Sequence, residues 1–340
     1  MTHKVVLCLA LAAATSLLAC QRMEQVEQVV ANRMGLTPTT ISSPEPMMVT
    51  PVAAGGYTAG RLETKTMTVG GLQRTYHVYV PRSLQSGTLA PIIYAFHGGG
   101  GNAEQFESRM DWRGAAEKYG AILVLPQAYG RGGDDNGNWN AESTIPLGFA
   151  ERNHLDDLGF LQAMFSVMQA NYPVDRSRTY LAGFSNGGMF SYRAACELGV
   201  QKISAVAVVA TTMSFSSCAK PQGISLLHIH GTDDENIPLE GGRGTNSARR
   251  ANWPAVARGV DVFKSGNQCS SGQQLVRPAS DTSCSVYSCG GNDEVELCIV
   301  QNGGHAWPGG DPANWQIKEN IYVSRAFNAT DYVAKFLLQH

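Results

Sequence analysis

The chain has 340 residues, of which 43% are hydrophobic and 16% are charged, enough apolar material for one large globular domain. Its 26 Lys and Arg residues nearly balance its 28 Asp and Glu residues, and no long run of like charge is present. Binding to phosphate backbones needs concentrated positive charge, so the composition argues against nucleic acid as a partner.

The N-terminus has the pattern of an export signal. His3 and Lys4 precede an apolar stretch at residues 5–18 that is too short to span a bilayer comfortably. The Leu-Leu-Ala-Cys that ends at Cys20 resembles a bacterial lipobox, which implies cleavage before Cys20 and a lipid on its thiol; an ordinary signal peptide is the alternative. We expect a signal peptide at 1–19 and a lipid anchor as the sole membrane attachment. Gln21 after the cysteine favours the outer membrane in a bacterium with two membranes, and an extracellular location is the alternative.

Residues 20–60 are predicted to form a flexible tether, because they are polar and contain scattered prolines that cannot build a core. Apolar residues recur at helical spacing between Met23 and Met34, which permits a short amphipathic helix. One large folded domain is expected at residues 61–340.

From residue 61 onward, strand patterns alternate with helix patterns. Residues 67–69 and 76–80 flank Gly70-Gly71, a hairpin signature. Apolar runs of the buried-strand type stand at 91–96, 121–125, 179–182, 205–210 and 225–229. Helical patterns stand at 160–168, 189–198 and 329–338. This alternation predicts an α/β fold, with a mainly parallel central sheet and helices on both of its faces.

The cysteines predict disulfides. Cys8 would be removed with the signal peptide, and the thiol of Cys20 would carry the lipid. Six of the eight cysteines then remain, an even number in an exported protein. Cys284 and Cys298 fall symmetrically about a turn at 290–293, where a hairpin would place them on facing strands. The remaining neighbours then pair as Cys196 with Cys218 and Cys269 with Cys289. A zinc site is the alternative, but no tight Cys-x-x-Cys pair with a matching second half is present.

The strongest chemical motif is Gly-x-Ser-x-Gly at 183–187, with Ser185 at its centre. It lies between the strand expected at 179–182 and the helix expected at 189–198, which is the setting of a nucleophile elbow. Its glycines leave room for a strained serine backbone and for close packing of strand against helix. We predict that Ser185 is the nucleophile; a chance Gly-rich turn is the alternative.

A serine nucleophile needs a base, and the base needs an acid to orient it. In α/β-hydrolases the chain order is Ser, acid, His. The downstream histidines are His228, His230, His305 and His340. The first two fall in or at the end of a strand and His340 is terminal, so His305, in the glycine-rich loop at 303–310, is predicted to be the general base and then the general acid. A surface-loop histidine is the alternative.

Three carboxylates follow the strand at 225–229, namely Asp233, Asp234 and Glu235. The hydrolase pattern His-Gly-x-x-Asp-x-x-Ile/Val-Pro places the triad acid on Asp234, with Asp233 as the alternative. The two that are not catalytic are expected to be solvated acids in a turn.

Acyl transfer also needs backbone donors for the developing oxyanion. His97 and the glycines at 98–101 follow the strand at 91–96, where the second oxyanion donor of this fold arises. We predict the amides of Asn186 and Gly99 as donors, with Gly98 as the alternate, and a structural role for His97. A phosphate-binding loop is the alternative, but the Lys-Ser/Thr pair of a P-loop is missing.

Four segments together resemble the polyhydroxybutyrate depolymerase-like and feruloyl esterase-like α/β-hydrolases, namely residues 97–102, 183–189, 230–234 and 304–310. The likeness covers about residues 64–338, and its His-x-Trp-Pro-Gly segment is more specific than the elbow alone. The resemblance implies an α/β-hydrolase fold and ester hydrolysis through an acyl-serine intermediate. It places the triad on Ser185, Asp234 and His305, without a metal or organic cofactor.

The resemblance favours small or aryl esters, such as feruloyl or acetyl groups on polysaccharide. Polymer depolymerases of this kind often carry Cys after the His-Gly of the oxyanion loop and an extra polymer-binding module, whereas Gly99 occupies that place here and no such module fits. Polyhydroxybutyrate depolymerase or oligomer hydrolase is the alternative. Trp139 and Trp307 are predicted to border the acyl pocket, with core packing as the alternative. The loop at 130–140 faintly suggests calcium but lacks EF-hand spacing.

Two other functions are compatible with these motifs. A peptidase or acyltransferase is one, because a serine triad serves any acyl transfer. A non-catalytic surface lipoprotein that binds through a hydrolase shell is the other, although such a shell has no need of a complete triad and oxyanion loops. The expected partner is an ester, small or polymer-linked, and the protein is expected to be a monomer.

Overall fold

The computed structural model describes residues 56–85, 87–133, 136–245 and 251–340. The predicted signal peptide, Cys20 and the helix expected between Met23 and Met34 lie outside the described residues. All of the described residues belong to one unit, Val49–His340. Within them, no helix has the length and the apolar character needed to cross a bilayer.

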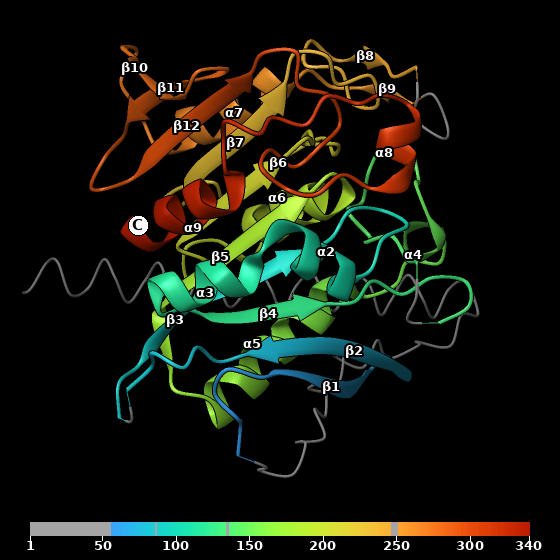
Figure 1. Cartoon of the computed structure of the whole chain (residues 1–340), viewed down its shortest axis with the longest axis vertical. Coiled ribbons are helices and arrows are strands. Elements are labelled where there is room, and N and C mark those ends of the chain that lie inside the picture. The colour runs from blue at the N-terminus through green and yellow to red at the C-terminus, as the bar shows by residue number, and fades with distance from the viewer. Residues whose placement is uncertain (1–55, 86, 134–135, 246–250) are drawn as a thin grey trace, which may run out of the picture. The chain divides into compact units, whose positions relative to one another are not determined.

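A ten-stranded sheet, counted over the described residues, forms the centre of this unit (Figure 1). In spatial order its strands are β1 (Leu62–Val69), β2 (Leu72–Tyr79), β4 (Ile122–Pro126), β3 (Ala90–Phe96), β5 (Val174–Phe184), β6 (Ala205–Val209), β7 (Ser225–Gly231), β12 (Glu294–Val300), β11 (Thr282–Ser288) and β10 (Gln274–Ala279). The strands from β4 to β12 in this order are parallel, and antiparallel strands extend both ends. A second, two-stranded sheet joins β8 (Gly242–Arg243) to β9 (Asn252–Trp253).

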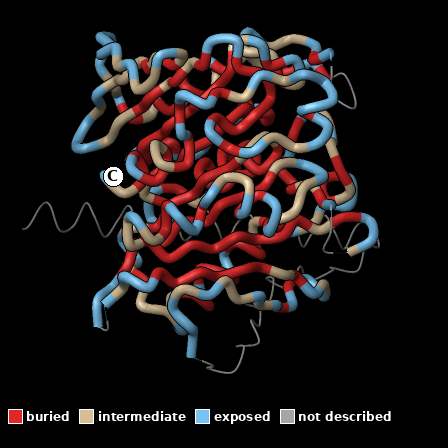
Figure 2. The backbone as a smooth tube through the Cα atoms, viewed as in Figure 1, coloured by how far each residue is buried: buried red, intermediate tan, exposed pale blue. Residues whose placement is uncertain are grey.

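Helices cover both faces of the large sheet. In Figure 1, α2 (Ala103–Met110), α3 (Trp112–Tyr119) and α9 (Ala329–Gln339) lie in front of it, and α5 (Asp157–Asn171), α6 (Asn186–Leu198) and α7 (Val256–Gly266) lie behind it. Each set packs on its own apolar cluster. The strands between them, which Figure 2 shows in red, are buried at every residue of β3, β4, β6 and β7. This is the α/β-hydrolase architecture, and the fold predicted from the strand and helix alternation is confirmed.

The predicted hairpins are both present. Gly70 and Gly71 adopt positive φ angles of 57° and 77° in the turn between β1 and β2, the backbone that a two-residue hairpin turn requires. β11 and β12 pair so that Cys284 lies directly opposite Cys298. The two short helices α4 (Phe149–Arg152) and α8 (Asn314–Lys318) lie toward the carboxyl edge of the parallel strands (Figure 1).

All three predicted disulfides are formed, joining Cys196 to Cys218, Cys269 to Cys289 and Cys284 to Cys298. Glu296 lies beside the last of them, in a spacing that would suit a metal. The two sulfurs are bonded to each other, however, so they offer no thiolate to an ion. Burial raises the pKa of Glu296 to about 7, and the Tyr332 hydroxyl donates to its carboxylate at 2.5 Å.

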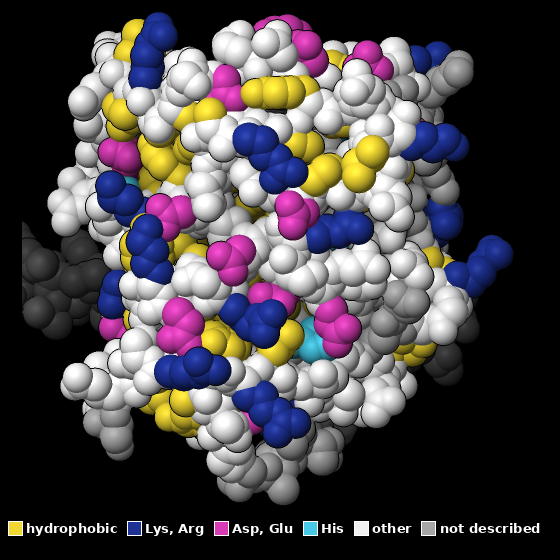
Figure 3. All heavy atoms as spheres, in the orientation of Figure 1, with side chains coloured by type: hydrophobic (Ala, Val, Ile, Leu, Met, Phe, Trp, Pro, Cys, Tyr) yellow, Lys and Arg dark blue, Asp and Glu magenta, His cyan; other side chains and the backbone are white. Residues whose placement is uncertain are grey.

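Charges of both signs are interspersed over the face shown in Figure 3, without a single-sign field among the coloured residues. This distribution fits the formal net charge of −2. The surface thus gives no electrostatic reason to expect a polyanion on this face.

Candidate active site

Ser185 stands at the tip of a sharp turn between β5 and α6. Its backbone has φ 53° and ψ −121°, a strained conformation for a residue with a side chain. A side chain at Gly183 would lie 2.4 Å from the Gly187 carbonyl oxygen, and one at Gly187 would lie 2.4 Å from the His97 carbonyl oxygen. The Thr211 hydroxyl donates to the Ser185 carbonyl at 2.7 Å. The turn therefore has the geometry of a nucleophile elbow, and its two glycines are required by close backbone contacts.

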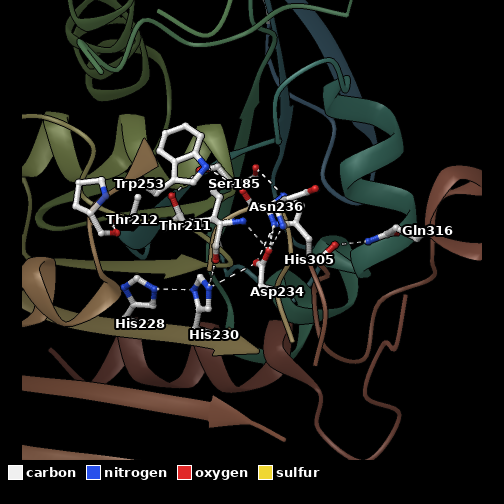
Figure 4. A network of polar contacts seen from close by, with 12 residues as sticks. Ser185, Thr211, Thr212, His228, His230, Asp234, Asn236, Trp253, His305 and Gln316 are labelled. Atoms are coloured by element: carbon white, nitrogen blue, oxygen red, sulfur yellow. Dashed lines mark hydrogen bonds and ion pairs between the residues drawn. The ribbon is translucent and has the colours of Figure 1, made fainter. Parts of the chain in front are cut away.

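His305, in the loop after β12, faces Ser185 at the carboxyl edge of the sheet (Figure 4). Its Nε2 is 2.9 Å from Ser185 Oγ, and its Nδ1 is 2.9 Å from Oδ2 and 3.2 Å from Oδ1 of Asp234. Gln316, on α8, donates from Nε2 to the His305 carbonyl at 2.8 Å. The fold thus places the three predicted triad residues in one hydrogen-bonded row, and α8 holds the backbone of the histidine.

Asp234 is buried, and its carboxylate has several donors. The amides of Asn236 and Ile237 donate to Oδ1 at 2.9 Å and 2.8 Å. Burial alone would raise the pKa of Asp234, but His305 and these other partners hold the pKa below its usual range. Asp233 is exposed and accepts a hydrogen bond from the neighbouring threonine hydroxyl. The structure therefore brings Asp234, and not Asp233, to the base.

Two further histidines lie beneath the acid (Figure 4). His230 Nε2 is 2.8 Å from the Ile237 carbonyl oxygen and 3.5 Å from Asp234 Oδ2. His230 Nδ1 is 3.3 Å from His228 Nε2, and His228 Nδ1 is 2.8 Å from the Tyr192 hydroxyl oxygen. Burial lowers the pKa of His230 and lowers that of His228 well below its usual range. Both imidazoles are therefore neutral, and they support the acid rather than contact the nucleophile.

Two backbone amides border the space beside Ser185. Asn186 begins α6, so its amide has no acceptor within the helix. Gly99 lies in the loop after β3, where a side chain would stand 2.4 Å from Asn138 Nδ2 and 3.4 Å from Asn186 Cβ. Both residues line the same cavity as Ser185. The two predicted oxyanion donors therefore lie on neighbouring walls of this cavity.

His97 supports the oxyanion loop from below. Burial lowers the pKa of His97 to about 4, so the ring is neutral. Its Nε2 accepts from the Ala128 amide at 3.1 Å, which leaves Nδ1 as the donor to the Gly98 carbonyl at 2.8 Å. The structural role predicted for His97 is consistent with these contacts.

Trp139 and Trp307 do not form the walls of the cavity, which corrects the prediction for both. Trp139 is 0% exposed, packs on Phe190 and donates from Nε1 to the His97 carbonyl at 2.9 Å. Trp307 is 1% exposed, packs on Trp112 and donates from Nε1 to the Thr330 hydroxyl at 2.8 Å. Both rings fill space between the sheet and its helices, and both N–H groups have partners there, so packing determines their positions.

The cavity beside Ser185 has a volume of about 910 Å³. The apolar side chains of its lining include Leu147, Met189, Ile237, Ala251 and Trp253, which we take together as its apolar part. The lining also contains the exposed residues Gln105, Asn314, Trp315 and Glu319 and the half-buried Arg109, which we take together as its polar, exposed part. The sequence patterns did not single out Trp253 or Trp315, because neither residue lies in a motif. The polar segment around Trp315 was the one available signal, since a tryptophan among hydrophilic neighbours is rarely a core residue.

Comparisons with known proteins agree with this geometry. A family model described as Phospholipase/Carboxylesterase matches residues 158–276, which include Ser185 and Asp234. The protein NocK of Nocardia uniformis subsp. tsuyamanensis, which bears the provisional name of an esterase, is 28% identical over 322 residues, covering 89% of each chain. Feruloyl esterase B of Piromyces equi is 25% identical over 67% of this chain and 42% of its own.

Coverage of some relatives is partial. The bifunctional acetylxylan esterase/xylanase of Neocallimastix patriciarum is 28% identical over 48% of this chain, but the match spans 22% of its own length. The solved acetyl xylan esterase from Aspergillus awamori aligns with a TM-score of 0.52 at 14% identity, covering 76% of this chain and 98% of that one. At this identity the likeness shows the fold alone.

Fold and site together define an α/β-hydrolase with the active site of a serine carboxylic ester hydrolase. A strained serine, an imidazole within hydrogen-bond reach of it, a buried acid and two backbone amides are what acyl transfer requires. Relatives named as feruloyl and acetylxylan esterases are consistent with this class.

Proposed function

We propose that the protein hydrolyses carboxylic esters through an acyl-serine intermediate, with feruloyl or acetyl groups on polysaccharide as its substrates. The observation that carries the proposal is the hydrogen-bonded row of Ser185, His305 and Asp234. His305 Nε2 lies 2.9 Å from Ser185 Oγ, and His305 Nδ1 lies 2.9 Å from Asp234 Oδ2. Ser185 faces a cavity that Gly99 and Asn186 also line. The names of the relatives support the choice of acyl group.

The residues act in a fixed order. His305 Nε2 takes the proton from Ser185 Oγ as the oxygen attacks the ester carbonyl, and the amides of Gly99 and Asn186 bind the oxyanion. His305 then gives that proton to the leaving alcohol, and the acyl group remains on Ser185. A water molecule, deprotonated by His305, attacks the acyl-serine, and the proton returns to Ser185 as the acid product leaves. Asp234 stabilises the imidazolium in both steps.

A panel of esters tests the proposal. We expect hydrolysis of p-nitrophenyl acetate, methyl ferulate and acetylated xylan, and slower or absent hydrolysis of hydroxybutyrate oligomers and peptides. Ser185→Ala should lower kcat by roughly 10⁶-fold and abolish labelling by a fluorophosphonate. Preference for hydroxybutyrate oligomers would favour the depolymerase function, and a folded wild type that neither labels nor hydrolyses any ester would favour a binding shell.

We also propose that the protein is exported and anchored through a lipid on Cys20, and that it acts as a monomer. Three disulfides support export, because such bonds persist in oxidising compartments. Labelling with radioactive palmitate should be lost in Cys20→Ser, and the unlabelled variant should move from the membrane to the soluble fraction. Retention of label in Cys20→Ser would contradict the anchor. Light scattering of the purified protein tests the monomer.

A further inference from the structure

We infer that the polar, exposed part of the cavity is a saccharide subsite, centred on the indole of Trp315, that binds the alcohol part of the ester. The inference rests on the proposed function, since it concerns the same reaction. It adds which surface recognises the sugar and which residues decide between a sugar ester and a simple alkyl ester.

The position of Trp315 follows from the reaction geometry. The leaving alcohol must lie beside His305 Nε2, because that atom gives it a proton. The Trp315 ring lies 6.3 Å from the His305 ring, centroid to centroid. Gln316, the next residue on α8, is buried and bonded to the His305 carbonyl, as Figure 4 shows. The indole therefore lies beside the base that gives the leaving alcohol its proton.

The chemistry of this part of the cavity suits an uncharged polyhydroxylated ring. Trp315 is 40% exposed, although burial of an indole is normally favourable. The same cavity is also lined by Gln105, Arg109, Asn314 and Glu319. In the described part of the chain, no hydrogen bond or ion pair engages these four side chains, so they are available to ligand hydroxyls. One cation and one anion offset each other, which favours a neutral ligand over a charged one.

A sugar ring matches this surface in shape as well. One face of such a ring carries C–H groups, which pack on the face of an indole, while its rim carries hydroxyls for the surrounding polar groups. The apolar part of the cavity, with Trp253 and Ile237 both buried, offers no such mixture. The two parts of the lining therefore divide the ester, with the acyl group against the apolar part and the sugar against Trp315.

The alternative occupant is a lipid or polyester surface, because Ile317 on the same helix is 63% exposed. Ile317 is absent from the cavity lining, however. It therefore provides a control, since it is also an exposed apolar residue of the same short helix but has no place in the proposed subsite.

The experiment compares esters that share an acyl group and differ in the alcohol: feruloyl arabinose with methyl ferulate, and acetyl xylose with methyl acetate. In Trp315→Ala, the ratio of kcat/KM for the sugar ester to kcat/KM for the methyl ester should fall about tenfold, mainly through KM. Trp315→Phe should recover part of the ratio because it keeps an aromatic face. Ile317→Ala should leave the ratio at the wild-type value.

Each outcome decides the inference. An unchanged ratio in Trp315→Ala would overturn it while leaving the proposed function intact. An equal fall in Ile317→Ala would overturn it in favour of an extended apolar docking surface. A wild type that cleaves p-nitrophenyl acetate but neither sugar ester would overturn the proposed substrates, and the subsite with them. Relief of xylotriose inhibition in Trp315→Ala, measured on methyl ferulate, would support the subsite independently of turnover of sugar esters.

Discussion

The reaction centre and the cavity walls are built in different ways. At the reaction centre, each group is held by several short hydrogen bonds: Asp234 has two backbone amides and an imidazole, and His305 has a partner on each ring nitrogen. On the walls, the indole N–H of Trp315 has no hydrogen-bond partner among the residues that the structure describes, and the side chain is 40% exposed. The centre is therefore over-determined by its neighbours, whereas the walls can change without loss of the catalytic geometry.

This contrast explains why the reaction centre sets the class of reaction, whereas the cavity walls set the choice of ester. A triad serves any acyl transfer, so it sets the class of reaction. The walls decide which acyl group and which alcohol reach it, because selectivity comes from differential contacts in the transition state. Substitutions at the centre should change the rate on every ester, and substitutions on the walls should change the ratio between esters.

After the loss expected for Ser185→Ala, the largest effect is expected at the acid. Asp234→Asn should lower kcat by about 10⁴-fold on every ester, because an amide cannot hold the required tautomer of His305 or stabilise its positive charge. Steady-state kinetics on p-nitrophenyl acetate measures this. The matched control is Asp233→Asn, at the adjacent exposed position, which should retain wild-type kcat. A comparable loss in both variants would contradict the distinction between the two acids.

The next effect is a pH dependence of the free energy of unfolding, which arises from His97, the residue that supports the oxyanion loop. The pKa of His97 is about 4 in the fold, against an ordinary value of 6.5, so folding favours the neutral ring. This stabilisation is complete above pH 6.5 and is lost as the pH falls toward 4, where the loss reaches about 3 kcal/mol. Urea unfolding between pH 7 and 4.5 measures it. His97→Gln should show a shallower dependence than wild type; parallel curves would contradict the neutral assignment.

A smaller effect is expected at the apolar wall. Trp253 is 6% exposed, lines the cavity and donates from Nε1 to the Asn236 carbonyl at 2.9 Å. Trp253→Ala should lower kcat/KM for methyl ferulate relative to methyl acetate by about tenfold, since an aryl acyl group loses more packing than an acetyl group. Trp253→Phe keeps a ring and should retain most of the ratio. An equal fall on both esters would mean that Trp253 supports the fold rather than the acyl group.

The smallest effect is expected at the core tryptophan. Trp139→Phe removes the donor to the His97 carbonyl while keeping an aromatic ring against Phe190. The free energy of unfolding should fall by about 1 kcal/mol, because a buried carbonyl loses a hydrogen bond. The ratio between methyl ferulate and methyl acetate should stay at the wild-type value. A changed ratio with unchanged stability would show that Trp139 borders the substrate after all.

Much of the fold could be predicted because its signals are local. The apolar runs at β3, β6 and β7 are long enough to mark buried strands, and Gly70-Gly71 marks a hairpin turn. The cysteine pairing was also accessible, since a turn in the sequence placed Cys284 opposite Cys298. In each case, residues close in the sequence determine the outcome.

The sequence by itself determined the order of Ser185, Asp234 and His305 and the turns that carry them, because each stands in a motif whose backbone needs particular residues nearby. Only the tertiary structure decided which tryptophans line the cavity. Trp139 and Trp307 lie close to the motifs yet are buried, whereas Trp253 and Trp315 lie in segments without a motif and line the cavity. The physical reason is that these side chains lie in loops or in elements too short to show a periodic pattern, so their burial depends on helices and strands that pack against them from distant parts of the chain.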